Sequence, residues 1–130
     1  MGHTLGRILI VDDEPPLLRM MSLYLRRLGY TVSTADSTDE AWALVEADRS
    51  AFAGAILVGS MAGMSMQELA SRMLSANPSL CVLSASGYPV DISALAAQAP
   101  GRVAFLLKPF TPEALGTAVR RLLAKEEEEL

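Results

Sequence analysis

Five short apolar runs alternate with segments in which apolar residues recur at helical spacing, and this alternation constrains the fold more than any other feature of the sequence. The runs cover residues 7–11, 30–35, 53–59, 80–85 and 103–107. Strand–helix alternation of this kind predicts a parallel sheet with helices on both faces, because crossovers are right-handed and each helix must cover the sheet. We therefore expect a single α/β sheet of five strands.

The third run is the best candidate for the centre of that sheet. Residues 55–58 are apolar without interruption, which is typical of a parallel strand buried on both faces. The loop after such a strand, at its carboxyl end, is where open α/β sheets place their chemistry. Here the strand ends on Val58, whose isopropyl group offers no chemistry.

Length and charge limit the possible classes of protein. A chain of 130 residues suits one domain, which we place at 7–124, between an N-terminal extension (1–6) and an acidic tail (125–130). The net charge of −4 argues against direct binding of nucleic acid through a basic surface. No apolar run approaches the roughly 18 residues of a membrane span, and no secretory segment precedes the first strand, so we expect a cytoplasmic protein without membrane contact.

Residue counts exclude several kinds of site. Cys81 is the only cysteine and His3 the only histidine, so an internal disulfide, a Cys-rich zinc site, a His-based metal site and a Ser–His triad are all excluded. Capping residues are predicted at the start of three helices: Ser37, Ser65 and Thr111. The helix after Ser37 is expected to bury Ala41, Leu44 and Val45. The first helix is expected to form one apolar face from Leu17, Leu18, Met21, Leu25 and Leu28.

Polar residues follow three of the predicted strands. Asp12 and Asp13 end the first strand, Ser86 ends the fourth and Lys108 follows the fifth. Because the carboxyl ends of parallel strands meet at one edge, these side chains should lie around one crevice. Adjacent carboxylates are a reasonable start for a Mg²⁺ site, and a hydroxyl and an ammonium opposite them could hold phosphoryl oxygens.

Four motifs, in this order and spacing, resemble the receiver domain of two-component response regulators from Ile8 to about Leu123. They are ILIVDDE at 8–14, GMS at 63–65 before Glu68, NP at 77–78 with SGY at 86–88, and FLLKPF at 105–110. The last two are similar to the receiver domains of hybrid histidine kinases.

The resemblance implies a flavodoxin-like, doubly wound sheet of order 2-1-3-4-5 in a bacterial signalling protein. In this family a histidine kinase transfers a phosphoryl group to an aspartate at the tip of the third strand. Residues matching Asp12 and Asp13 hold Mg²⁺, those matching Ser86 and Lys108 contact the phosphoryl oxygens, and an aromatic residue matching Phe105 acts as a switch. The peptide bond after the lysine is commonly cis.

One departure from the family pattern decides the functional interpretation. Counting back from the 63–65 motif places the acceptor aspartate at Val58, and Ala62 and Met66 replace the proline and glycine usual in the neighbouring loop. The site thus lacks its nucleophile and one Mg²⁺ ligand. We expect a weak or empty Mg²⁺ site at Asp12 and Asp13, no required cofactor, and an ion pair of Lys108 with one of these aspartates. Ser86 then caps the turn before Gly87, and Phe105 is either the switch or static core.

The segment 90–99 is the clearest indication of a partner, because it is rich in alanine and carries one charge, Asp91. We expect it to be a helix that, with the last strand and last helix, binds a histidine kinase, an output domain or a second copy; the alternative is a poorly ordered segment.

The predicted function is a pseudo-receiver in phosphorelay signalling that is not an enzyme and acts by protein–protein contact. Two alternatives stay open: a receiver phosphorylated on a non-standard residue, and a small flavodoxin-like enzyme or nucleotide binder. The latter is disfavoured because no Gly-rich loop follows the first strand.

Overall fold

The computed structural model describes residues 6–59 and 63–128, with side chains as far as Ala124. The strands in these ranges are β1 (Arg7–Val11), β2 (Thr31–Ala35), β3 (Gly54–Val58), β4 (Cys81–Ser86) and β5 (Val103–Leu107). The helices are α1 (Pro15–Arg27), α2 (Thr38–Ala47), α3 (Met66–Ala76), α4 (Ser93–Gln98) and α5 (Pro112–Glu128). Each strand boundary agrees with the predicted run to within one residue. Among the helices described, none has the length and apolar character of a transmembrane segment.

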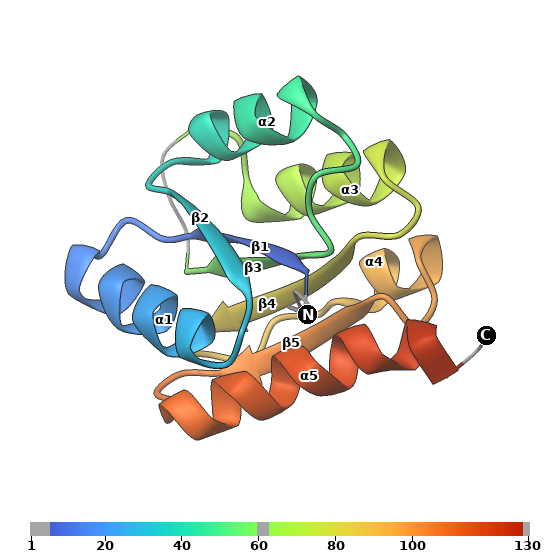
Figure 1. The fold of residues 1–130 in the computed structure, drawn as a ribbon. Coiled ribbons are helices and arrows are strands. Elements are labelled where there is room, and N and C mark those ends of the chain that lie inside the picture. The colour runs from blue at the N-terminus through green and yellow to red at the C-terminus, as the bar shows by residue number, and fades with distance from the viewer. Residues whose placement is uncertain (1–5, 60–62, 129–130) are drawn as a thin grey trace.

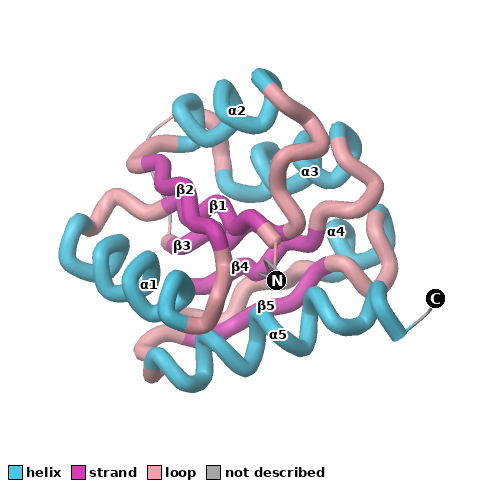
Figure 2. Tube along the Cα trace, in the orientation of Figure 1, coloured by secondary structure: helices cyan, strands magenta, loops and turns pink. Residues whose placement is uncertain are grey.

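The strands form one parallel sheet of order β2-β1-β3-β4-β5, which confirms the predicted flavodoxin-like fold. Helices α2 and α3 cover one face, and α1 and α5 cover the other (Figures 1 and 2). The chain first winds outward from β1 to β2 and then crosses back to β3. The carboxyl ends of β1 and β3 therefore flank the point where the winding reverses, which is where such sheets bind their ligands.

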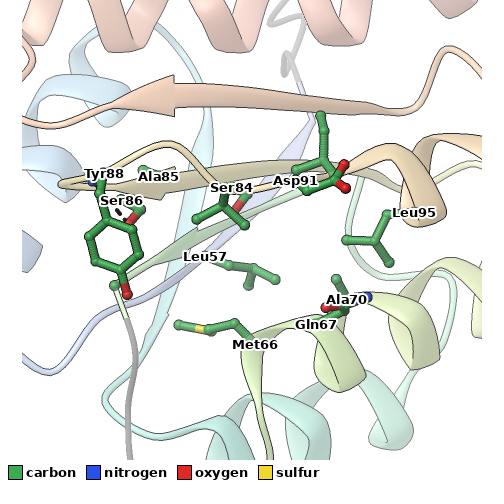
Figure 3. Close-up of a pocket in the computed structure, with 13 residues that line it drawn as sticks. Leu57, Met66, Gln67, Ala70, Ser84, Ala85, Ser86, Tyr88, Asp91 and Leu95 are labelled. Atoms are coloured by element: carbon green, nitrogen blue, oxygen red, sulfur yellow. Dashed lines mark hydrogen bonds between the residues drawn. The ribbon is translucent and has the colours of Figure 1, made fainter.

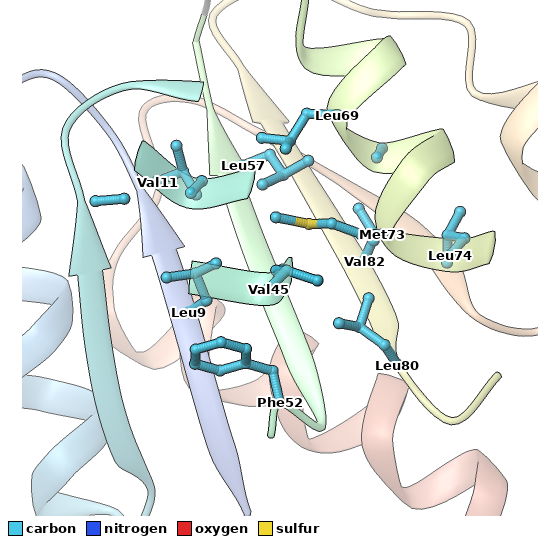
Figure 4. Packing of buried hydrophobic residues seen from close by; sticks show 14 of the residues in the cluster. Leu9, Val11, Val45, Phe52, Leu57, Leu69, Met73, Leu74, Leu80 and Val82 are labelled. Atoms are coloured by element: carbon cyan, nitrogen blue, oxygen red, sulfur yellow. The ribbon is translucent and has the colours of Figure 1, made fainter. Parts of the chain in front are cut away.

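The layer between the sheet and helices α2 and α3 is apolar and closely filled (Figure 4). Its buried side chains include Leu9, Val11, Val45, Phe52, Leu57, Leu69, Met73, Leu80 and Val82. Burial of each large side chain contributes about 1.5–3 kcal/mol to folding. This layer fixes β3 against α3 and so holds the carboxyl end of β3 in place.

The two faces of β3 alternate as the strand pleat requires. Ala55 and Leu57 pack in the layer with α2 and α3, whereas Ile56 and Val58 pack in the layer with α1 and α5. In that second layer α5 approaches α1 closely at Gly116, where an added Cβ would lie 2.9 Å from a Tyr24 ring carbon. Val58 is therefore part of a tightly packed apolar layer.

The three predicted helix caps are confirmed. Ser37 Oγ accepts a hydrogen bond from the Glu40 backbone N–H at 3.1 Å, and Ser65 Oγ accepts one from the Glu68 N–H at 3.0 Å. Thr111 Oγ1 accepts from the Ala114 N–H at 3.0 Å. Each bond satisfies a backbone donor that the first helical turn leaves unpaired, which fixes where α2, α3 and α5 begin.

The prediction of a helix over 90–99 was too long, since α4 covers only Ser93–Gln98 in the structure. Asp91 Oδ1 accepts a hydrogen bond from the Ser93 N–H at 2.9 Å, and such a local bond holds the backbone before Ser93 in a turn. One residue predicted to be buried was also wrong, because Leu44 is 36% exposed on the outer side of α2.

Candidate functional site

The carboxyl edge of the sheet brings the predicted site residues together. Asp12 follows β1, Val58 and Ser86 close β3 and β4, and Lys108 follows β5. Val11 lies opposite Leu57 in the strand register, so Asp12 and Val58 occupy neighbouring positions. Ser86 lies opposite Leu107, and the Lys108 N–H donates to the Ser86 carbonyl at 2.7 Å. The predicted crevice is therefore built from the ends of four neighbouring strands.

Val58 stands at the end of the central strand with 1% of its surface exposed. Its register partner on β4 is Ala85, and the next residue, Gly59, donates its N–H to the Ala85 carbonyl at 2.9 Å. On the β4 side Val58 is thus flanked by the methyl group of Ala85, and the residue that follows it has no side chain. Ala62, which the sequence places in the loop after this strand, lies outside the described residues.

Asp12 is a buried carboxylate, with 1% of its surface exposed. Its Oδ1 accepts a hydrogen bond from the Glu14 N–H at 3.1 Å, whereas its buried Oδ2 has no hydrogen-bond partner within the described residues. Burial raises the pKa of Asp12, and the Glu14 N–H and the charge of Lys108 oppose that rise only in part. The site therefore favours the protonated form of Asp12 more than water would.

Lys108 pairs with Glu14, and the prediction that it would pair with Asp12 or Asp13 is wrong. Lys108 Nζ lies 3.2 Å from Glu14 Oε1. Glu14 has a longer side chain and is exposed at the start of α1, so it reaches the ammonium while Asp12 stays beneath the surface. The Lys108–Pro109 peptide bond is cis, as the resemblance implied. The lysine is thus held by backbone and side-chain contacts on either side of the crevice.

The donor set suits Mg²⁺ poorly. Asp13 is exposed beside buried Asp12, and Glu14 is engaged with Lys108. The described ranges contain no cluster of three or more His, Cys, Asp or Glu side chains able to hold a metal ion. Because Mg²⁺ dehydrates reluctantly and needs well-placed oxygens, Asp12 and Asp13, of which the first is buried, offer it few ligands.

Ser86 and Phe105 lie where the sequence placed them. Ser86 is 6% exposed, and its Oγ accepts from the Tyr88 N–H at 3.4 Å, a long bond consistent with the predicted cap of that turn. Phe105 pairs with Ser84 in the register of β4 and β5 and is half-buried. It belongs to neither buried apolar cluster of the described chain, so it is not a fully enclosed core residue. Its role as a switch stays a prediction.

Sequence reasoning missed a pocket beside this edge (Figure 3). It has a volume of about 170 Å³ and lies between β4, α3 and the segment that precedes α4. A usable signal was present in the sequence, since Ser84 interrupts an apolar strand and small residues such as Gly59 and Ala70 surround it. Reasoning from the sequence also missed Glu14 as the partner of Lys108, although it is the third acid of the 12–14 run.

Comparison with known proteins agrees with this arrangement. The model of the response regulator receiver domain matches residues 8–120. The alginate biosynthesis transcriptional regulatory protein AlgB of Pseudomonas aeruginosa is 32% identical over 118 residues, covering 91% of this chain and 26% of AlgB. The chain thus spans about a quarter of the length of that relative.

Solved structures share the fold over nearly the whole chain. A CheY-like response regulator receiver domain protein from Methanospirillum hungatei has a TM-score of 0.84 and 27% identity, covering 98% of this chain and all of the other. The receiver domain of the hybrid histidine kinase CckA has a TM-score of 0.76 and 27% identity, covering 91% and 99%. With the sheet order and the family match over 8–120, the chain belongs to the response regulator receiver domain family.

Proposed function

We propose that this chain is a pseudo-receiver: it acts in two-component phosphorelay signalling by protein–protein contact, without phosphorylation of an aspartate. The observation that carries the proposal is the side chain at the end of β3. Val58 is buried in the apolar layer with α1 and α5. An isopropyl group has no lone pair with which to attack a phosphoryl donor, so the position that matches the family's acceptor cannot form an acyl phosphate.

The electrostatics of the crevice support the same interpretation. Phosphoryl transfer depends on cations that offset the charge of the transferred group. Here Lys108 is engaged with Glu14, and burial raises the pKa of Asp12. We propose that no cofactor is required and that Asp12 and Asp13 bind Mg²⁺ weakly if it is supplied. The chain then has no catalytic residue of its own, and we propose that it is not an enzyme.

The proposed contact surface is formed by α4, β5, α5 and the segment before α4. Its exposed apolar side chains include Tyr88, Val90 and Leu107, which are 65%, 41% and 50% exposed. Large apolar side chains exposed on neighbouring elements favour a protein partner. We propose a histidine kinase, an output domain or a second copy as the partner, in the cytoplasm.

The comparisons leave the subgroup of receiver as a prediction. AlgB is named a transcriptional regulatory protein, and this chain covers a quarter of it, whereas CckA is named a hybrid histidine kinase. The motifs at 77–88 and 105–110 favour the hybrid-kinase type. An attached kinase or DNA-binding domain in the full-length gene product would decide between the two.

The proposal is tested by asking whether the folded protein accepts a phosphoryl group. The protein is incubated with Mg²⁺ and acetyl phosphate, and its intact mass is measured before and after. We expect an unchanged mass. A labile gain of one phosphoryl group would contradict the proposal and favour the alternative, a receiver that is phosphorylated on a non-standard residue.

A further inference from the structure

The pocket beside β4 is lined by residues from four elements of the fold, β3, α3, β4 and α4. Leu57 of β3 forms its floor, Met66 and Ala70 of α3 form one wall, and Leu95 of α4 forms the other (Figure 3). Its volume is about 170 Å³. The pocket lies on the α2–α3 face of the sheet, opposite the layer that holds Val58.

The space exists because small residues meet where larger ones would fill it. Gly59, Ala70 and Ser84 lie around the pocket and have little or no side chain to project into it. The segment before α4 adds to the gap, since regular helix begins only at Ser93 and Tyr88 and Val90 remain exposed. The pocket is thus a consequence of local sequence rather than of loose packing in the core.

Two hydroxyl groups give the pocket a polar side. Ser84 and Ser86 lie two positions apart on β4, so both face the α3 side of the sheet. The Ser84 hydroxyl has no hydrogen-bond partner within the described residues, and the Ser86 hydroxyl is engaged only by the long bond from the Tyr88 N–H. A ligand that offers one hydroxyl group would therefore find an unused partner on β4.

The rim of the pocket is anionic. The Asp91 carboxylate lines the opening, and hydrogen bonds from Ser93 lower its pKa, so it is ionised at neutral pH. An exposed carboxylate at the entrance disfavours anionic ligands by like-charge repulsion. The chemistry of the pocket is thus apolar on its floor and walls, hydrogen-bonding on one side and unfavourable to negative charge.

We propose that this pocket binds a small neutral aromatic molecule with one hydroxyl group, its ring between Leu57, Met66 and Leu95 and its hydroxyl on Ser84. The volume sets the size: an apolar cavity of about 150 Å³ in another protein accepts benzene, whereas drug-sized ligands occupy pockets of about 300–1,000 Å³. A single ring fits this range and a nucleotide does not. The pocket shares Ser86 with the edge that holds Val58 but lies on the α3 face of the sheet, and binding there does not depend on whether the domain is phosphorylated.

Phenol is the probe that tests the proposal, with toluene and benzoate as matched ligands. Each is titrated into the ¹⁵N-labelled full chain and followed by amide chemical shifts. We expect saturable shifts for phenol at Met66, Ser84 and Leu95, weaker binding of toluene by about two- to tenfold through loss of one hydrogen bond, and no saturable shift with benzoate. Absence of saturation with phenol, or shifts centred instead on Leu23, an exposed apolar residue of α1, would overturn the proposal.

Two variants at one position separate the polar and apolar contributions. Ser84→Ala should weaken the binding of phenol to the level of toluene and leave the binding of toluene unchanged. Ser84→Leu should fill the pocket and abolish saturable shifts from both ligands. Ser50→Ala, at an exposed serine before β3, is the control and should bind phenol like the wild type. Amide spectra of each variant report whether it is folded. If Ser84→Leu does not fold, Ser84→Ala remains decisive, because unchanged phenol affinity would contradict recognition through that hydroxyl.

Discussion

Lys108 Nζ lies 3.2 Å from Glu14 Oε1, which joins the end of β5 to the start of α1 across the mouth of the crevice. The two residues are 94 positions apart in the chain. Their side chains are 25% and 60% exposed, so water screens the pair. The ammonium that the family directs at a phosphoryl group is here occupied by a solvent-exposed acid.

The Lys108–Glu14 pair should contribute little to stability. A double-mutant cycle with Glu14→Gln and Lys108→Met is expected to give a coupling free energy of about 0.2–1 kcal/mol, because exposed ion pairs gain little over their solvated ions. Urea unfolding of the four proteins measures it. A coupling of several kcal/mol would mean that the pair is shielded from water and structurally important.

Asp12→Asn should change how stability depends on pH. Since folding raises the pKa of Asp12 above its ordinary value of 3.8, its protonation favours folding below that value and the contribution is lost as pH rises through the folded pKa. The ionised, buried carboxylate therefore destabilises the wild type at neutral pH. We expect Asp12→Asn to raise the free energy of unfolding at pH 7, with the difference vanishing near pH 3.

Urea unfolding between pH 3 and pH 8 provides the measurement for Asp12→Asn. Asp13→Asn, at the exposed neighbour, is the control and should change stability little at any of these pH values. A wild type that gains stability over Asp12→Asn as pH rises would show that the carboxylate is stabilised rather than penalised by its surroundings.

Arg102 should be a structural anchor at the opposite edge of the sheet. Its guanidinium donates to the carbonyls of Leu80, Leu74 and Asn77 at 2.9, 3.2 and 2.6 Å, which ties the end of α3 to the start of β5. Arg102→Met should cost about 1.5–3 kcal/mol, because bonds from a charged donor are lost and carbonyls are left unpaired.

A second arginine offers a matched control for Arg102. Arg72 pairs with Glu68 at 2.7 Å, but both side chains are about half exposed, at 45% and 52%. Arg72→Met should cost about 1 kcal/mol or less. Thermal or urea unfolding of both variants measures the two costs. Equal losses in the free energy of unfolding would contradict the anchoring role given to Arg102.

Val58→Asp should create a response to Mg²⁺ that the wild type lacks. Position 58 neighbours Asp12 in the register, so the new carboxylate adds a third acid to the crevice. Without metal, a buried polar group beside a like charge should lower the free energy of unfolding by about 1–3 kcal/mol. Mg²⁺ should restore part of the loss, because a divalent cation offsets the repulsion.

Thermal unfolding with and without Mg²⁺ measures this response. The asparagine of Val58→Asn has nearly the shape of aspartate but no charge, so this variant should be destabilised but insensitive to Mg²⁺. A Mg²⁺-induced rise in Tm of the wild type equal to that of Val58→Asp would contradict the weak site inferred from Asp12 and Asp13.

Most of the fold could be predicted from the sequence because its signals are local and repeated. Uninterrupted apolar runs such as 55–58 identify buried parallel strands, and hydroxyl residues such as Ser37 and Thr111 identify where helices begin. The convergence of Asp12, Ser86 and Lys108 followed from topology alone, since parallel strands end at a common edge. These features depend on neighbours in the chain or on the strand order.

What the sequence did not reveal depends on contacts in three dimensions. The predicted partner of Lys108 was wrong, because the choice among three adjacent acids depends on side-chain length and burial. These put Glu14 at the surface and Asp12 below it. The predicted start of α4 was wrong, because the local hydrogen bond from the Ser93 N–H to the Asp91 carboxylate competes with the first helical turn. The pocket was missed because the small residues that leave the gap, such as Ser84 and Ala70, belong to different elements and are brought together only by the fold.

The most direct test of the central claim compares the wild type with Val58→Asp under phosphorylating conditions. Both proteins, with folding checked by amide spectra, are incubated with Mg²⁺ and acetyl phosphate, and their intact masses are recorded beside a receiver domain of known competence as a positive control for the donor. The account predicts that the wild type gains no mass, whatever the variant does, because no acceptor oxygen ends β3. A labile gain of one phosphoryl group by the wild type would contradict it.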